Sequence, residues 1–416
     1  MAEDQLIEAV RAGRAHLVRD VLRAGVEPET TDADGVSMLC LAVDAFDGYV
    51  AEVLLEAGAD PLRPLPDGST PLLRAVASGH AGVTVALLRH GEDRLAEEQR
   101  AGLLACARHW YETGAETGLR RATGATGPVE SRRFVDDFDV NEYHVIALGG
   151  MRVCDGHSAV LTCLEAEFGL RRSFDDLFAR ALARADGEHA DWWEATAVLA
   201  KRSDVEAWEA ALALRSDPDP LRRQFAAALV WCFLIVDRPA PLGEWPWERR
   251  AVEFLLPWVT EETDPAVLVS VLRGLNSVDV DDPKIEEVGL TFRTHPDPRV
   301  RVQVPTMLGR TRHAYTHPEA LEVLAALARD TDARVRASVC EVLYEFEGRS
   351  PAVADILAGF LDDDDQLVRI KAVSGLADAD DPRCVEGARL IGPVDRADAD
   401  DWLLDAAERY AQRHSG

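Results

Sequence analysis

The chain has 416 residues, 47% of them hydrophobic, and a formal net charge of −29 at pH 7. This length exceeds what one hydrophobic core usually serves, so we expect two or three domains. The charge disfavours nucleic acids and anionic membranes as partners, because binding them relies on Lys and Arg, and it favours a protein partner, in particular a basic one. Only three lysines accompany the many arginines, a bias typical of bacterial genomes rich in G and C.

A 33-residue period runs through the first hundred residues. Gly25, Gly58 and Gly91 lie 33 positions apart, and each follows an apolar segment with helical spacing. A period of this length predicts a stack of helical units that bury one another's apolar faces. Each glycine is suited to the left-handed conformation that ends a helix. We therefore predict three successive helical units, of which the first is a cap.

Turn and helix-start motifs in these units resemble those of the ankyrin repeat. Asp-Gly dipeptides at residues 34–35 and 67–68 are turn signals, since glycine adopts positive φ without a clash. A Thr-Pro-Leu motif follows at residues 70–72, where the proline fits the first turn of a helix. The resemblance is closest over residues 3–92, and a degraded fourth unit follows.

The ankyrin resemblance implies a binding surface. Ankyrin proteins bind partners through hairpin tips and through the ends of the first helix of each repeat, on the concave side. Carried over to this sequence, these positions imply a protein-binding site at Asp34, Asp44, Phe46, Asp67 and His80. Phe46 stands where the repeat usually has glycine, which either puts an aromatic ring on the concave edge or distorts the turn.

The middle of the chain loses the helical pattern. Residues 111–133 mix Gly and Pro with polar residues and predict a linker or long loop. Two short apolar runs flank a Gly-Gly pair at 149–150, which predicts a β-hairpin. His157 lies near Asp155 and Cys154. We interpret this cluster as a helix cap with a solvated histidine, and a metal or catalytic site is the alternative.

A second motif recurs in the last half of the chain, where an Asp is followed by Val or Leu and then Arg at the start of an apolar helix. Its anchors Val267, Val300, Val335 and Val368 are 33, 35 and 33 residues apart. The aspartate caps the helix and the valine packs inward. This pattern resembles HEAT repeats of the short bacterial type over roughly residues 190–411.

An arginine column accompanies these anchors at Arg301, Arg336 and Arg369. We interpret the column as an Asp–Arg ladder between neighbouring repeats. The alternative is an anion-binding stripe on the concave face, which makes the same three arginines partner-binding residues.

Seven of the nine tryptophans lie between residues 192 and 258. Most suit packing between repeats, since a buried aromatic side chain contributes about 1.5–3 kcal/mol. Trp245 and Trp247 flank a proline in a Pro-rich insertion, where a helix interior is disfavoured. We predict that these two are exposed loop aromatics that anchor a partner.

The sequence carries no catalytic signature. It has no P-loop, no nucleophile elbow and no H-E-x-x-H zinc motif. Deoxyhypusine hydroxylases, which also contain helical repeats, use His-Glu dipeptides as iron ligands, and none of the eleven histidines here precedes a glutamate. We therefore expect no cofactor, no metal and no enzymatic activity.

The sequence also indicates the cellular compartment of the protein. Seven scattered cysteines predict reduced thiols, and the acidic N-terminus has no apolar signal-peptide region. The longest apolar run is about 12 residues, too short to cross a bilayer. We expect a cytoplasmic protein.

Together these features predict an α-rich, all-α solenoid in three segments: an ankyrin-repeat domain over residues 1–110, a loop-rich connector with a short hairpin over 111–157, and a HEAT-like domain over 158–416. We predict a non-enzymatic scaffold or adaptor that binds a protein through the concave surfaces of both arrays.

Two alternatives stay open. One is an immunity- or antitoxin-type inhibitor of a basic protein. The other is an enzyme with an unrecognised site near residues 140–200, which a deep pocket holding His144, Asp155 or His157 would favour.

Overall fold

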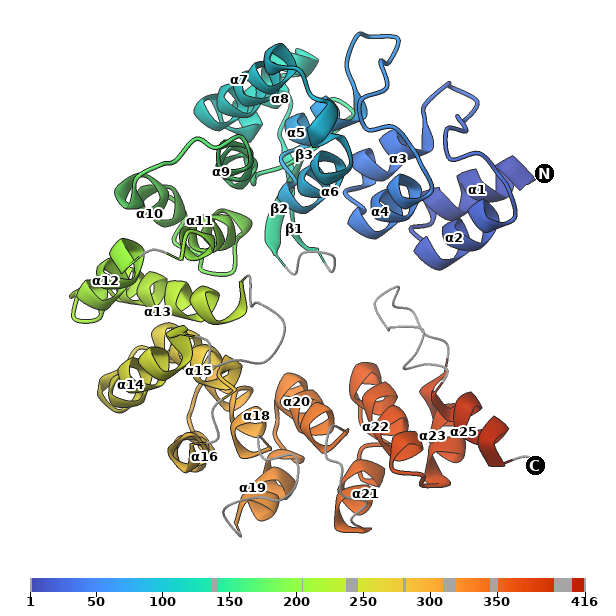
Figure 1. Ribbon diagram of the computed structural model, residues 1–416. Helices are drawn as coiled ribbons and strands as arrows, with labels where there is room; N and C mark the ends of the chain where they lie inside the picture. Colours follow the sequence, from blue (N-terminus) through green and yellow to red (C-terminus); the bar gives the residue numbers. More distant parts are fainter. Residues whose placement is uncertain are drawn as a thin grey trace. The chain divides into compact units, whose positions relative to one another are not determined.

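The computed structural model describes residues 2–136, 141–203, 205–236, 246–279, 282–309, 319–344, 351–392 and 406–414. The described chain is mainly helical with one small sheet (Figure 1), so the predicted α-rich solenoid class is confirmed. It forms two compact units, Met1–Ala207 and Trp208–Gly416. The finer division at residues 110 and 157 stays a prediction.

The first unit begins with three stacked helical pairs, and each helix of one pair contacts its counterpart in the next. The pairs are α1 (Ala2–Arg11) with α2 (Ala15–Arg23), α3 (Met38–Ala45) with α4 (Gly48–Glu56), and α5 (Pro71–Ser78) with α6 (Ala81–Gly91). They are followed by the 3-10 turn η1 (Glu92–Arg94), α7 (Glu97–Thr113), α8 (Ala115–Thr123), α9 (His157–Glu167), α10 (Phe174–Leu182), α11 (Ala190–Lys201) and α12 (Val205–Leu214), which crosses the unit boundary.

Local signals explain where these helices begin and end. Ser37 and Thr70 cap α3 and α5, because their hydroxyl oxygens accept hydrogen bonds from backbone N–H groups of the first turn. Gly25 and Gly58 have φ of 96° and 100°, as predicted for glycines after a helix. Gly91 has φ of −123°, because α6 includes it and the chain turns directly into η1. The prediction of a left-handed residue there is wrong.

The sheet is antiparallel with strand order β1-β2-β3, and its strands are β1 (Glu130–Val135), β2 (Glu142–Leu148) and β3 (Met151–Cys154). β2 and β3 are joined by Gly149 and Gly150, whose φ values of 60° and 84° are those of a tight hairpin turn. The predicted hairpin is therefore confirmed.

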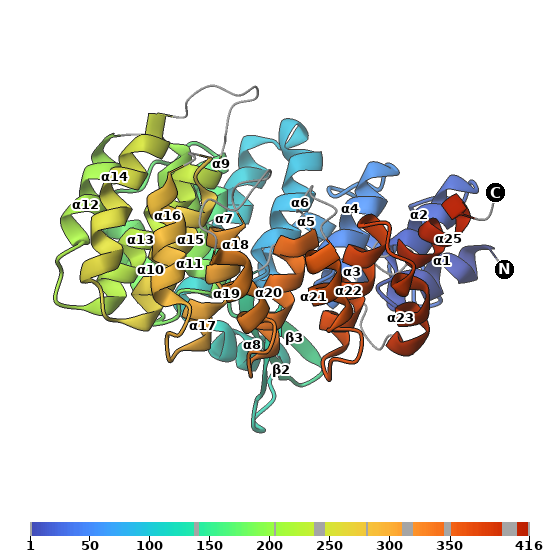
Figure 2. The same ribbon diagram turned by 90° about the horizontal axis from the view of Figure 1, so that it is seen from below.

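The predicted loop over residues 111–133 is wrong, because α8 and most of β1 form within it. α8 lies against β2 and β3 (Figures 1 and 2). Leu119 of α8 is buried with Leu148 and Val153 in a small apolar cluster. This contact between segments stabilises α8, which the local sequence of residues 111–133 does not predict.

The second unit is a succession of helices, and within the described residues no helix combines the length and apolar character needed to cross a bilayer. After α12 come α13 (Pro220–Ile235), α14 (Pro246–Glu261), α15 (Pro265–Ser277), α16 (Pro283–Phe292), α17 (Pro298–Arg301), α18 (Val304–Leu308), α19 (Ala320–Leu327), α20 (Ala333–Tyr344), α21 (Pro351–Ala358), α22 (Gln366–Asp378), α23 (Arg383–Ile391) and α25 (Ala406–His414).

Several helices of this unit begin at aspartate caps, as the recurring sequence motif predicts. Asp264, Asp297 and Asp365 each accept a hydrogen bond from a backbone N–H two residues ahead, so all three are caps. The four valine anchors are fully buried, as predicted: Val267, Val300, Val335 and Val368.

Candidate functional site

Two of the predicted partner-binding residues, Phe46 and His80, lie in the core of the first unit. Phe46 is 3% exposed and His80 is fully buried. The sheet covers these two residues. The His80 ring stacks on Tyr143 of β2 with 4.4 Å between ring centroids, and Phe134 of β1 contacts the rings of Phe46 and His80. The predicted binding role of Phe46 and His80 requires exposed side chains. It is wrong for these two residues, because the chain's own strands occupy this edge.

Phe46 adopts the left-handed conformation usual for glycine at the end of a helix, with φ of 60° and ψ of 31°. A side chain there carries backbone strain, which packing must offset. The Phe46 ring stacks on His80, and the Arg152 guanidinium lies 5.6 Å from its centroid. Arg152 also donates to the carbonyl oxygen of Asp44 at 2.8 Å. β3 is thereby fastened to the end of α3.

Two glycines let the backbone after β3 touch the end of α5. A Cβ on Gly79 would lie 2.2 Å from the carbonyl oxygen of Cys154, and a Cβ on Gly156 would lie 2.8 Å from the carbonyl oxygen of Gly79. Close-packed interiors do not accommodate such approaches. Both positions therefore require glycine for the two segments to meet.

The predicted residues Asp34, Asp44 and Asp67 are exposed on the first unit. Asp67 accepts hydrogen bonds from Ser69 and pairs with Arg74 at 3.0 Å, and these contacts lower its pKa to about 2. Burial raises the pKa of the Asp44 carboxyl, although the residue as a whole is exposed. The role of all three residues in partner binding stays a prediction.

A buried ionic network lies beside the sheet. The backbone N–H of Asp191 donates to His189 Nδ1, so Nε2 of that ring carries the proton and donates to Asp155 at 3.0 Å. Arg184 pairs with Asp155 at 2.6 Å and with Asp191 at 3.1 Å. Asp191 also accepts from the backbone N–H of Ala159 in the first turn of α9. The network joins the end of β3 to α9, to the segment that follows α10 and to α11.

Burial and partners act differently on the two carboxyls of this network. Burial raises the pKa of Asp191. Burial pushes Asp155 in the same direction, but the hydrogen bond from His189, the charge of Arg184 and the backbone N–H of His144 hold its pKa below the usual value.

His157 begins α9 and is 3% exposed, so its interpretation as a solvated histidine is wrong. Its ring stacks on Trp110 with 4.9 Å between centroids, and its Nε2 lies 3.1 Å from the carbonyl oxygen of Ala77. Burial lowers the pKa of His157 to about 4. The ring is therefore neutral at pH 7 and donates through Nε2.

A cavity of about 360 Å³ lies against this network and includes Asp155 and His157 in its lining. Such a pocket is what the enzyme alternative requires. The Ser158 hydroxyl is buried in the lining but has no hydrogen-bond partner among the described residues, so no base is placed to activate it. In the part of the chain that the structure describes, no group of His, Cys, Asp and Glu is arranged to hold a metal ion.

In the second unit the arginine column links consecutive helical pairs. Arg301 binds Asp330 through two contacts of 2.7 and 2.8 Å, and Arg336 binds Asp363 through two contacts of 2.7 Å. Each aspartate lies two residues before the residue that caps the next helix, and it accepts a hydrogen bond from the backbone N–H of that residue. The predicted Asp–Arg ladder is confirmed for these two rungs, and partner binding by the same arginines stays a prediction.

Arg369 is the third member of the column and has a different environment. It donates to the carbonyl oxygens of Asp363 and Asp364 at 2.5 and 3.3 Å. Its Nε has no partner within the described residues. A partner-binding role stays a prediction here too.

Trp247 lies in the first turn of α14 and is 6% exposed. Its ring is 5.0 Å from that of Trp208 and 4.9 Å from that of Phe233. The prediction of an exposed loop aromatic is wrong for Trp247, because the preceding proline starts a helix rather than extending a loop. Trp245 lies outside the described residues.

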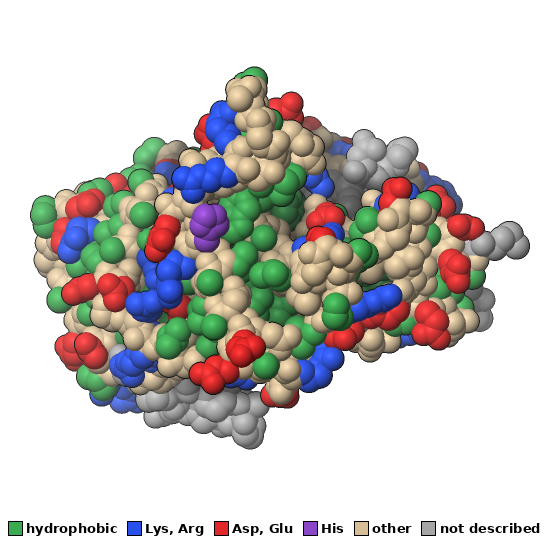
Figure 3. All heavy atoms as spheres, turned by 90° about the horizontal axis from the view of Figure 1, so that it is seen from above, with side chains coloured by type: hydrophobic (Ala, Val, Ile, Leu, Met, Phe, Trp, Pro, Cys, Tyr) green, Lys and Arg blue, Asp and Glu red, His purple; other side chains and the backbone are tan. Residues whose placement is uncertain are grey.

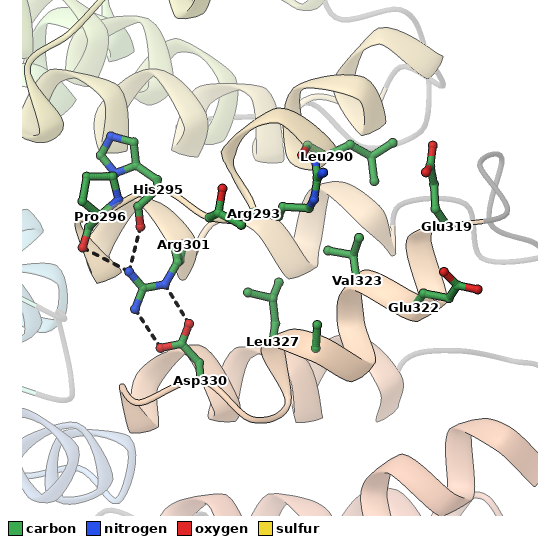
Figure 4. Close-up of a pocket in the computed structure, with 12 residues that line it drawn as sticks. Leu290, Arg293, His295, Pro296, Arg301, Glu319, Glu322, Val323, Leu327 and Asp330 are labelled. Atoms are coloured by element: carbon green, nitrogen blue, oxygen red, sulfur yellow. Dashed lines mark hydrogen bonds and ion pairs between the residues drawn. The ribbon is translucent and has the colours of Figure 1, made fainter.

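A cavity of about 780 Å³ lies beside α16 and α19 (Figure 4). Leu290 of α16 and Val323 and Leu327 of α19 supply its apolar wall. The ion pair between Arg301 and Asp330 lies at one end of this wall.

The other end of this cavity is acidic. Glu319 and Glu322 lie there, both exposed (Figure 4). Neither carboxylate has an ion-pair or hydrogen-bond partner among the described residues. The apolar wall with exposed carboxylates beside it is the combination that a protein segment with an apolar and a basic side chain fits.

Surface charges are mixed on the face seen in Figure 3. Basic side chains occur there in small groups among acidic ones, and a band of hydrophobic side chains crosses the middle. The described residues on this face do not form the continuous basic stripe that a nucleic-acid phosphate backbone requires.

Sequence reasoning missed the strand that covers Phe46 and the buried network at Asp155. Residues 130–133 are all polar and only Phe134 and Val135 are apolar, so the local sequence shows no alternation that would mark this strand. It also missed Glu165, which is 1% exposed and pairs with Arg180 at 2.9 Å. No pattern along the chain marks a buried glutamate whose partner lies in another helix.

Comparison with known families supports the HEAT part of the resemblance. Residues 285–377 match a family described as HEAT repeats, and this stretch includes both confirmed rungs of the ladder. The described fold and this match define a helical-repeat protein. No curated protein matches the chain.

Three solved structures are similar to part or all of the chain. The Escherichia coli protein YibA shares 16% identity over 61% of this chain and 96% of its own, with a TM-score of 0.43. An engineered protein shares 15% over 100% and 99%, with a TM-score of 0.40. Human deoxyhypusine hydroxylase in complex with glycerol shares 14% over 58% and 96%, with a TM-score of 0.23. Similarity at this level carries no information about activity.

Proposed function

We propose that this protein is a non-enzymatic scaffold or adaptor that binds another protein through the cavity beside α16 and α19. The observation that carries the proposal is the apolar wall flanked by the exposed carboxylates of Glu319 and Glu322, which have no ion-pair partner among the described residues. The fitting partner segment has an apolar side chain next to Lys or Arg. The net charge of −29 steers such a basic segment toward the protein over longer distances.

The proposal extends to the first unit. The 33-residue period, the Asp-Gly turns and the three stacked pairs α1–α6 support their assignment as ankyrin repeats. Asp34, Asp44 and Asp67 are then the contact residues that remain exposed there. All seven cysteines are free thiols, which supports a cytoplasmic protein, and the scarcity of lysine relative to arginine supports a bacterial one.

The test is photo-crosslinking from inside the cavity. A photoreactive amino acid replaces Ala326, an exposed lining residue, and adducts are collected in the native host. We expect one major protein adduct, with a basic contact segment identified by mass spectrometry. The double substitution Glu319→Arg and Glu322→Arg is expected to reduce that adduct about tenfold or more, because it reverses two charges next to the bound segment.

The matched control is Glu287→Arg, which reverses an exposed charge on α16 outside the cavity lining. It is expected to leave the adduct unchanged, and both variants should melt like the wild type. An equal adduct in the double variant and the wild type would refute the proposed site.

Two other functions lead to different results. If the captured partner is a toxic enzyme that loses activity when bound, the scaffold is an immunity- or antitoxin-type inhibitor. The cavity at Asp155 and His157 supports an enzyme as second candidate. Turnover of a small molecule that disappears in His157→Gln, with an unchanged melting temperature, would replace the scaffold proposal.

A further inference from the structure

The outer edge of β1 pairs with no other strand of the described chain. Strand order β1-β2-β3 puts β1 at the border of the sheet. Five of its six residues, Glu130–Val135, are exposed, and only Phe134 is partly buried. Natural proteins usually protect such an edge with proline, a bulge or a covering segment, because its backbone is ready to bind a further strand.

The ladder shows which backbone groups face outward. The N–H of Asp136 donates to the carbonyl oxygen of Asn141, which makes these two a hydrogen-bonded pair. Such pairs alternate along an antiparallel ladder, so the even-numbered residues of β1 bond to β2. The N–H and C=O groups of Ser131, Arg133 and Val135 therefore point to the free edge.

The edge is held in place before any partner arrives. Phe134 lies between the outward-facing Arg133 and Val135 in sequence, and its ring contacts Phe46 and His80 in the core. A partner strand thus binds a formed backbone and does not have to order it, which favours affinity.

Charge selects the partner. Arg132 is exposed and has no ion-pair partner among the described residues, while Arg133 pairs with Glu142. Glu130 begins the same strand and Arg133 is already paired, so Arg132 is the exposed, unpaired cation of β1 among the described residues. An acidic strand is complementary to Arg132, since oppositely charged side chains on adjacent strands attract.

A second copy of β1 fits less well. Two copies of β1 can pair antiparallel only in registers in which residues that face the free edge lie opposite one another. In the two such registers with the greatest overlap, the two-fold axis between the copies passes through Arg132 or through Arg133. Each register sets an arginine directly opposite its own copy, and like charges in that position repel.

We propose that the free edge of β1 binds an acidic, extended segment of a partner protein, which adds to the sheet as a fourth strand. This surface goes beyond the proposed cavity, which lies in the other unit and selects basic segments.

The experiment uses two end-blocked, fluorescein-labelled hexapeptides in which valine alternates with either glutamate or lysine. Both are titrated into the full chain up to millimolar concentration while anisotropy is recorded. Ser131→Pro removes one outward N–H and leaves the ladder to β2 intact, because proline is tolerated where the N–H faces solvent. Ser131→Ala is the matched control that keeps this N–H.

We expect the glutamate peptide to bind the wild type and Ser131→Ala equally, and Ser131→Pro about fivefold or more weakly. The lysine peptide should not bind. Arg132→Glu should abolish binding of the glutamate peptide, and an unchanged melting temperature excludes unfolding as the cause.

Three results would overturn the proposal: no binding of the glutamate peptide to the wild type, equal binding by Ser131→Pro, or equal binding of the lysine peptide. A dimer in light scattering that dissociates in Ser131→Pro would assign the edge to a second copy instead. Ser131→Pro leaves Glu319 and Glu322 untouched, so crosslinking from Ala326 reports on the other proposal separately.

Discussion

Burial decides the ionisation of His157, although its neighbours in the sequence suggested another role. Asp155 and Cys154 precede it closely, a pattern that metal and catalytic sites also show. In the fold its ring stacks on Trp110, and Nε2–H points to the carbonyl oxygen of Ala77. A charged imidazolium gains too little from these contacts to repay the loss of water.

We predict that NMR titration of the His157 ring gives a pKa of about 4, against an ordinary value of 6.5. Between these values the unfolded chain binds a proton that the folded chain does not. The free energy of unfolding therefore falls as pH decreases from 6.5 to 4, by up to about 3 kcal/mol from this group. Denaturant titrations at both ends of this window measure the loss. A ring that titrates near 6.5 would contradict the buried, neutral state.

At the scale of elements, the ladder joins each helical pair to the next. Arg301 holds Asp330, whose carboxylate also accepts the backbone N–H of Asp332. One arginine thereby orders the loop that starts α20. The short α17 and α18 depend on this tie more than a long helix would, because short helices have little stability of their own.

We predict that Arg301→Met lowers the free energy of unfolding by about 1–3 kcal/mol, because Asp330 is left largely buried without its cation. The double variant Arg301→Met with Asp330→Asn should lose less than the sum of the single changes. Arg334→Met is the control: its pair with Asp332 is exposed, so it should cost less than about 0.5 kcal/mol. Strict additivity in urea unfolding would argue against the ladder.

At the scale of the whole molecule, the core of the first unit runs from Leu6 in α1 to Ala190 in α11 and includes Tyr143 of the sheet. The sheet thus belongs to the folding unit of the first helical pairs. A division after residue 110 cuts through this core.

We predict that a chain of residues 1–203 folds, whereas a chain of residues 1–110 melts at a clearly lower temperature and binds the dye ANS. The shorter chain exposes Phe46 and His80, and each large side chain uncovered costs about 1.5–3 kcal/mol. Circular dichroism and ANS fluorescence measure both effects. Equal melting temperatures would support residue 110 as a domain boundary.

The sequence was sufficient for features that are local or periodic. Caps such as Asp297, the turn at 149–150 and the buried anchor Val300 each follow from a few neighbouring residues. The covering of Phe46 by Phe134 was not predictable in this way, because it joins segments far apart in the chain and depends on shape. The prediction for Trp247 was wrong for another reason, because a proline is compatible both with a loop and with the first turn of a helix.

The contact of Gly79 with Gly156 has an evolutionary consequence. Neither residue can gain a side chain while the other segment stays in place, so the two are under one joint constraint. Homologues that retain the strands should keep glycine at both sites together, and homologues that lost the strands should be free to vary at both. Paired inheritance of these two glycines would therefore trace when the sheet was acquired by this lineage.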